Sequence, residues 1–280
     1  MKIFNKFPQL SIILLLVCAT SANAIPVKLK VTVTNNAPTK GVSLTPMWVG
    51  FHDGSFDSYN GGEASSSALE ALAEDGITDL ISTDFSAIPG EAQGVVFGEG
   101  QPPVIKPGNS GQAMLTVEND DSNRYFSYAS MVLASSDYFV ANGDPLKHDI
   151  SSLFDGSVNE ISFLIGLPGE VNDAGTEVND FNTSAGNGLF DGLPAGQTAP
   201  GEGVDENGVV TIVENPYAEF LNVPEGLDLS ALDFNQYPNG IAEITISAAP
   251  SAIPVPAALP LAASSFSLLF SMARLRRKTA

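Results

Sequence analysis

The sequence predicts an all-β protein, an antiparallel β-sandwich with one short helix. Most of its periodic segments alternate apolar and polar residues with a period of two, which is the pattern of strands with one buried face. Gly, Pro, Asn or Asp bound these segments, and strands do not alternate with long helices as they would in a parallel sheet. The chain of 280 residues leaves one domain, residues 25–250, once its two ends are set aside.

The clearest strand is residues 27–34, in which Val and Leu alternate with Lys and Thr. Further strands are expected at 113–118, 124–134, 160–166, 209–213 and 241–247. Residues 65–76, "SSSALEALAEDG", instead have apolar residues at helical spacing between serine caps and Gly76, which predicts the short helix. Residues 181–208 are rich in Gly and polar residues, so we expect a long surface loop there.

The first 24 residues have the pattern of a secretory signal peptide. Two lysines precede an apolar stretch, and Ala22-Asn23-Ala24 forms a small-x-small cleavage site before Ile25. The only cysteine, Cys18, lies within this segment. A mature chain without cysteine has no disulfide, thiolate metal site or cysteine nucleophile.

The C-terminal segment, residues 251–280, combines roughly twenty uncharged, largely apolar residues with a basic cluster at 274–278. One interpretation is a permanent membrane anchor. The stretch "IPVPAA" at 253–258 also resembles the PEP-CTERM sorting signals of Gram-negative surface proteins, in their VPLPA-type variant. That resemblance implies that a sorting protease of the exosortase type processes the tail, and that the body reaches the cell surface or is secreted.

The body between these segments is strongly acidic. It contains all 32 acidic residues and six basic ones, which gives a net charge of −26. A field of this sign repels nucleic acid and anionic lipid and attracts divalent cations, so we expect no nucleic-acid partner. Adaptation of the surface to salt water would produce the same composition.

One acidic stretch has no basic residue near it in the sequence. Residues 173–180, "DAGTEVND", contain three acidic residues, and no Lys or Arg occurs between His148 and Ala273. A tight turn at Gly175 would bring Asp173 and Glu177 onto one side, and Asp137 follows a predicted strand 36 residues earlier. Carboxylates and carbonyl oxygens are the ligands of calcium. The alternative is a solvated acidic turn.

Several segments, in this order, resemble the bacterial branch of the spondin domain, the N-terminal module of F-spondin and mindin. They are "FHDGSFDSYNGGEASSSALEALAEDG" at 51–76, "SYASMVLASSDYFVA" at 127–141, "DAGTEVND" at 173–180 and a closing strand at 241–246. The resemblance spans residues 27–247. It implies a C2-like antiparallel β-sandwich that holds a calcium ion in loops at one end.

The ligands that the resemblance implies are Asp137, in the "SSDYF" turn, and Asp173 and Glu177, which flank "AGT". This sequence has Glu177 where animal members of the family usually have Asp. Asn172, Asn179 and Asp180 are candidates for groups around these ligands. His52, in "HDGSFD", is expected to form hydrogen bonds rather than to bind a metal, because two histidines cannot form a His-rich zinc centre.

Two functions are compatible with these observations. The first is a secreted or surface-attached, calcium-binding adhesion or matrix module that recognises an extracellular polymer or surface ligand and is not an enzyme. The alternative is a secreted hydrolase that acts on polysaccharide through paired carboxylates. Two carboxylates facing each other across a deep cleft would favour the hydrolase.

Overall fold

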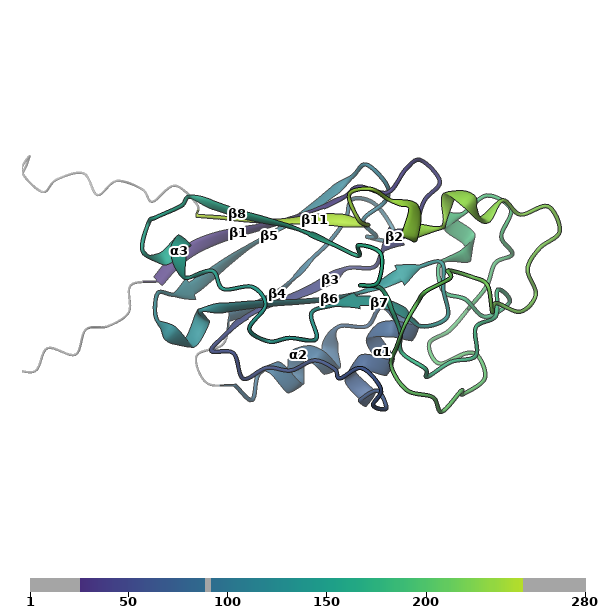
Figure 1. Ribbon diagram of the computed structural model, residues 1–280, viewed down its shortest axis with the longest axis horizontal. Helices are drawn as coiled ribbons and strands as arrows, with labels where there is room; N and C mark the ends of the chain where they lie inside the picture. The colour runs from purple at the N-terminus through teal and green to yellow at the C-terminus, as the bar shows by residue number, and fades with distance from the viewer. Residues whose placement is uncertain (1–25, 89–91, 249–280) are drawn as a thin grey trace, which may run out of the picture.

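A computed structural model describes residues 26–88 and 92–248, and these form a sandwich of two antiparallel sheets (Figure 1). The first sheet has the strand order β5-β1-β11-β8. The second has the order β10-β9-β7-β6-β3-β4, and the short strand β2 pairs with β6. The all-β, sandwich-like architecture predicted from the sequence is confirmed. The proposed signal peptide and C-terminal segment lie outside the described residues.

The first sheet consists of the following strands: β1 (Pro26–Asn35), β5 (Ser110–Glu118), β8 (Glu160–Ile165) and β11 (Ala242–Ala248). Strand β1 occupies its centre, because Val31 pairs with Ala113 of β5 on one side and with Ile246 of β11 on the other. Its alternating pattern places Leu29, Val31 and Val33 in the core while the lysines and threonines between them face outward. One buried face is the reason that the period of two is so clear here.

The second sheet contains strands that the alternation did not predict. Its strands are β2 (Ser43–Leu44), β3 (Met47–His52), β4 (Ala92–Val96), β6 (Tyr125–Leu133), β7 (Tyr138–Ala141), β9 (Asn172–Asp173) and β10 (Thr211–Ile212). All six residues of β3 are buried, because both faces of this sheet are covered. Val49 and Phe51 pack in the core between the sheets, and Trp48 packs on the opposite face. A strand buried on both faces has no polar positions from which to read a period.

Helices cover that opposite face. The expected helix is α1 (Ser67–Asp75), which begins with the Ser66 side chain accepting from the amide of Leu69 and ends at Gly76 in the left-handed conformation. The prediction of a single helix was wrong, because α2 (Asp79–Phe85) follows at once and α3 (Ser151–Phe154) adds one turn elsewhere. Figure 1 shows α1 and α2 beneath β3 and β6. The two helices that the sequence did not predict are short, with seven residues in α2 and four in α3, which is too few turns to show a helical period.

A hydrophobic cluster joins these helices to the sheet. Leu72 of α1 and Phe85 of α2 are buried against Trp48, and the rings of Trp48 and Phe85 meet edge to face at 5.0 Å between centroids. Gly50 permits this close approach, since a Cβ atom there would lie 2.8 Å from the ring of Phe85. No helix within residues 26–88 and 92–248 has the length and apolar character needed to cross a membrane.

The connections between strands gather at the end of the sandwich opposite the start of β1 and the end of β11 (Figure 1). They include the 3-10 helices η2 (Asn187–Leu189), η3 (Leu229–Ala231) and η4 (Phe234–Gln236), while η1 (Asp121–Asn123) follows β5. The prediction that 181–208 is a surface loop is wrong for its first part. Phe181, Ser184 and Asn187 are buried, so this part packs against the body.

Candidate metal centre

Pairing between two short strands brings Asp137 and Asp173 together. Asp137 immediately precedes β7, Asp173 ends β9, and the two strands pair with Tyr138 opposite Asp173. The amide of Ala174 also donates to the carbonyl oxygen of Asp137 at 3.1 Å. The strand pairing thus closes the 36-residue separation between the two aspartates.

Asp137 is fully buried and only half of its carboxylate is satisfied. Its Oδ2 atom accepts from the Thr176 amide (2.8 Å), the Thr176 hydroxyl (3.2 Å) and the Glu177 amide (3.2 Å). Its Oδ1 atom has no hydrogen-bond partner among the described residues. A buried carboxylate oxygen without a partner is costly, because burial removes the water that would otherwise solvate it.

The turn that donates to Asp137 depends on Gly175. This residue has a φ of +65°, and a Cβ atom there would lie 2.6 Å from backbone atoms of Val209. Only glycine fits a left-handed position so close to another backbone segment. The "AGT" turn therefore closes against residues 208–209 and directs its amides at Asp137.

Asp173 is half-buried and completes the pair. Its Oδ1 accepts from the Gly175 amide at 2.8 Å, and its Oδ2 accepts from the Asn179 side chain at 2.7 Å. The carboxylates of Asp137 and Asp173 lie near enough for the charge of Asp173 to act on Asp137. Burial raises the pKa of both aspartates, and the repulsion between the two charges raises that of Asp137 further.

Glu177 reaches the centre through its backbone, while its carboxylate lies to one side. The side chain is buried and packs against Gly203, where a Cβ atom would come within 2.2 Å of Oε1. That oxygen has no hydrogen-bond partner in the described part of the chain. Burial raises the pKa of Glu177 to about 8, and the charges of Glu74, Asp137 and Asp75 add to the rise.

The three predicted ligands are therefore not one compact carboxylate cluster. Across residues 26–88 and 92–248, no group of three or more His, Cys, Asp or Glu side chains is arranged to hold a metal ion. Two carboxylates lie together, and the third contributes its amide to the same turn. Oxygen ligands for a cation would thus also have to come from amides, carbonyls and water.

The residues predicted to surround the ligands do not all lie at the acidic centre. Asn179 lies at the centre, because its Nδ2 donates to Asp173 and its Oδ1 has no partner among the residues described. Asn172 instead donates to the hydroxyl of Tyr59 at 3.1 Å. Asp180 accepts from Asn222 at 2.7 and 2.8 Å. His52 lies at the end of β3, away from the turn, where its Nε2 is 2.8 Å from the hydroxyl of Ser127.

A pocket of about 290 Å³ opens beside Asp173. Its lining includes Tyr138, Asn179, Glu219 and residues 211–215, among them Glu214. The charge of Glu219 contributes to the raised pKa of Asp173. The sequence reasoning missed both glutamates, although they belong to the long stretch without Lys or Arg that singled out residues 173–180.

Chemically, the centre is a set of oxygen atoms, and no Lys or Arg among residues 26–88 and 92–248 forms an ion pair with it. The Arg and Lys residues that form ion pairs do so elsewhere, in Lys40–Asp191, Arg124–Asp149 and Lys147–Glu170. Comparison of the sequence with models of known protein families gives no match, and no curated protein matches it. The resemblance to the spondin domain thus rests on the sequence motifs quoted above.

Proposed function

We propose that the protein is a secreted or surface-attached calcium-binding module of the adhesion or matrix type, related to the spondin domain. The observation that carries the metal assignment is the Oδ1 atom of Asp137, which is buried without a partner beside a second carboxylate. A divalent cation there would supply the missing partner and reverse the repulsion within the pair. Calcium suits the centre because it accepts mixed oxygen ligands in irregular geometry.

The chain offers enough oxygen atoms for such an ion. Asp137 and Asp173 would be the charged ligands, and Asn179 carries an unpartnered amide oxygen next to Asp173. Glu177, the third ligand implied by the resemblance, has an unpartnered oxygen of its own and would need a change of side-chain rotamer to join them. Water in the adjoining pocket would complete the six to eight ligands of calcium. Bound calcium would fasten the 173–179 turn to the start of β7.

Burial favours a binding role over the alternative of polysaccharide hydrolysis. A glycosidase places its acid and its base on the two sides of the scissile bond, roughly 5–10 Å apart. Asp137 is fully buried and accepts hydrogen bonds from the amides of Thr176 and Glu177, so its carboxylate does not face Asp173 across an open cleft. The signal peptide and the sorting segment proposed from the sequence would deliver the module outside the cell, where calcium is plentiful and an extracellular polymer or surface is the partner.

Calorimetric titration with calcium chloride tests the metal assignment. We expect saturable binding by the wild-type protein and its loss in Asp137→Asn, which keeps the shape of the side chain and removes the charge. Asp121→Asn makes the same change of charge at an exposed position and should bind like the wild type. Equal binding by both variants would show that calcium only accumulates around the acidic surface. A screen of glycans and matrix polymers, with calcium and with EDTA, would then identify the partner.

A further inference from the structure

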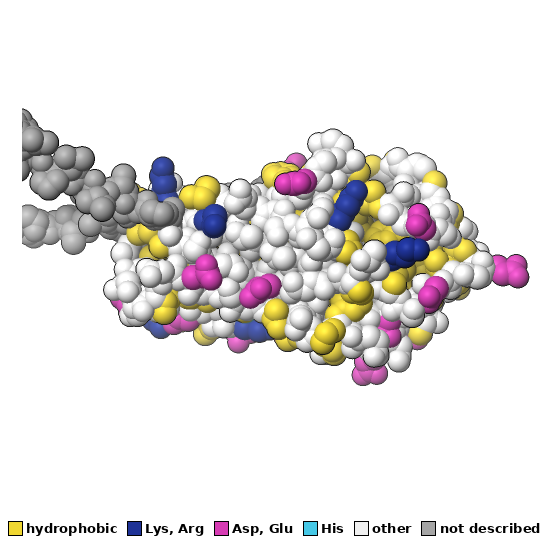
Figure 2. All heavy atoms as spheres, turned by 90° about the horizontal axis from the view of Figure 1, so that it is seen from above, with side chains coloured by type: hydrophobic (Ala, Val, Ile, Leu, Met, Phe, Trp, Pro, Cys, Tyr) yellow, Lys and Arg dark blue, Asp and Glu magenta, His cyan; other side chains and the backbone are white. Residues whose placement is uncertain are grey.

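A second hollow in the described part of the chain lies away from the acidic centre, and its lining includes two of the body's six basic residues. Its volume is about 410 Å³, and it shares no lining residue with the pocket beside Asp173. Figure 2 shows recessed apolar side chains with basic side chains beside them at the loop-rich end of the molecule. We call this hollow the lysine pocket, after Lys40 and Lys106 at its edge.

Buried hydrogen bonds hold the two lysine-bearing loops in place. The side chain of Asn35, at the end of β1, donates to the carbonyl of Val42 at 3.0 Å and to that of Ile105 at 2.9 Å. Its Oδ1 accepts from the amide of Ala37 at 2.8 Å. One buried amide thus ties the 37–42 loop, which carries Lys40, to the segment that precedes Lys106.

Tyr237 connects the same loop to the opposite wall. Its hydroxyl accepts from the amide of Val42 at 3.2 Å and donates to the carbonyl of Ala231, which lines the lysine pocket. Gly41 is needed for this contact, since a Cβ atom there would lie 2.7 Å from the hydroxyl oxygen of Tyr237. The walls are therefore fixed without a ligand, as in most small-molecule sites.

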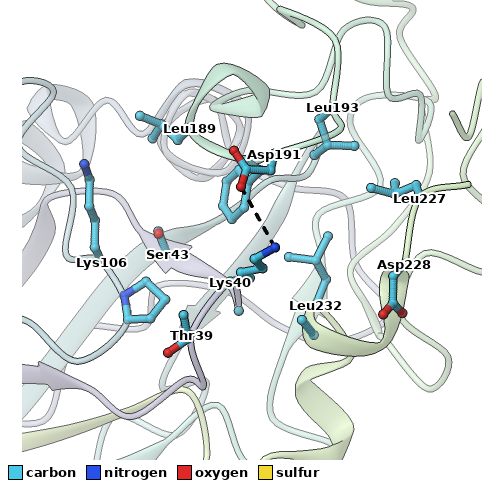
Figure 3. A pocket seen from close by; sticks show the side chains of 14 residues that line it. Thr39, Lys40, Ser43, Lys106, Leu189, Asp191, Leu193, Leu227, Asp228 and Leu232 are labelled. Atoms are coloured by element: carbon cyan, nitrogen blue, oxygen red, sulfur yellow. Dashed lines mark ion pairs between the residues drawn. The ribbon is translucent and has the colours of Figure 1, made fainter.

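The lining is apolar below and charged at the rim. Leu189, Leu193, Leu227 and Leu232 face the hollow, and Lys40 extends its amine toward Asp191 (Figure 3). That ion pair is long, at 4.0 Å, and both side chains are largely exposed. It therefore contributes little stability, and Lys40 can pair with another anion instead. Lys106 has no acidic partner within 4.0 Å among the residues described.

We propose that the lysine pocket binds a monocarboxylate with an apolar body of about ten carbon atoms. The carboxylate would pair with Lys106 and draw Lys40 from Asp191, while the alkyl chain covers the leucines. A single charge is required, because the acidic body and the rim residues Asp191 and Asp228 repel a polyanion. The volume of the hollow lies within the range of about 300–1,000 Å³ that is typical of ligand pockets.

Calorimetric titration of the full chain with decanoate, in EDTA, tests the proposal independently of calcium. We expect saturable binding, about tenfold weaker binding of decan-1-ol, and loss of this preference in Lys106→Gln. Lys28→Gln, an exposed change of the same charge on β1, should bind like the wild type. Leu227→Asn should weaken the binding of decanoate and the binding of decan-1-ol to the same extent.

Several results would overturn the proposal. They are the absence of saturable decanoate binding by the wild type, equal binding by Lys106→Gln and the wild type, or equal affinity of the wild type for decanoate and decan-1-ol. Loss of decanoate binding in Lys28→Gln would show that general surface charge, rather than the lysine pocket, attracts the anion. None of these results bears on the calcium proposal, because calcium is absent throughout.

Discussion

The acidic centre and the lysine pocket are both built from connections between strands, yet their polar groups are satisfied to different degrees. Beneath the lysine pocket, Asn35 and Tyr237 use their side-chain polar atoms in hydrogen bonds. At the acidic centre, Asp137, Glu177 and Asn179 each have a buried oxygen without a partner among the described residues. The comparison teaches that protein groups alone satisfy the polar atoms that brace the lysine pocket, whereas at the acidic centre they leave three buried oxygen atoms without a partner among the described residues.

The largest expected effect comes from removing the amide that braces the lysine pocket. Asn35→Ala leaves the carbonyl of Val42 and the amide of Ala37 buried without partners, and it leaves the carbonyl of Ile105 with only its bond from the Leu44 amide, so the free energy of unfolding should fall by about 3 kcal/mol. Asn36→Ala, at a partly buried neighbour with one long bond of 3.4 Å, should change it by less than about 1 kcal/mol. Urea denaturation in EDTA measures both. Similar stability of the two variants would show that the pocket walls are not braced by Asn35.

The second effect tests whether the acidic centre lacks a cation. A ligand at about 100 times its Kd stabilises the folded state by about 2.7 kcal/mol, which for a body of this size raises the Tm by roughly 5–10 °C. We expect this rise with calcium, a smaller one with magnesium, and little in Asp137→Asn. Scanning calorimetry at matched ionic strength measures it. A Tm rise of equal size with both cations and in the variant would show that the cations only screen the charge of the acidic surface.

A smaller effect concerns Glu177 and pH in the absence of calcium. Its pKa of about 8 in the folded protein lies above the ordinary value of 4.5. Below about pH 4.5 the side chain is protonated in both states; above it the unfolded chain releases the proton while the folded one retains it. This group therefore makes stability fall as the pH rises from about 4.5 to 8.

Glu177→Gln should remove that part of the pH dependence and leave the rest of the acidic body unchanged. We expect the variant in EDTA to lose less stability between pH 5 and pH 8 than the wild type does. Glu160→Gln, at an exposed position on β8, is the matched control and should follow the wild type. Parallel curves for all three proteins would place Glu177 in a solvated environment.

The residues explain which parts of these regions could be predicted. Strand β1 was readable because one face is buried, while β3 was not, because Trp48 and Val49 pack on opposite sides. The resemblance to the spondin domain singled out Asp137 and Asp173, which the structure places side by side. The carboxylate of Glu177 lies toward Gly203 because of packing between loops. Loop sequences show no periodic pattern from which such packing could be predicted.

The lysine pocket was invisible in the sequence for a related reason. Four separate segments line it, around residues 40, 106, 190 and 230, and none carries a motif. Lys40 and Lys106 were counted only as two of the few basic residues in an acidic body. Their juxtaposition follows from the hydrogen bonds of Asn35, a residue that the strand pattern identifies only as the end of β1.

A crystal structure of the protein grown in calcium is the most direct test of the central claim that the acidic centre is a cation site. We expect an ion within about 2.3–2.6 Å of Asp137 Oδ1 and of an oxygen of Asp173, with further oxygen ligands from the turn and from water. Anomalous scattering would distinguish calcium from water. Residues 173–180 ordered with only water at Asp137 Oδ1, or calcium bound elsewhere on the acidic surface, would contradict the account.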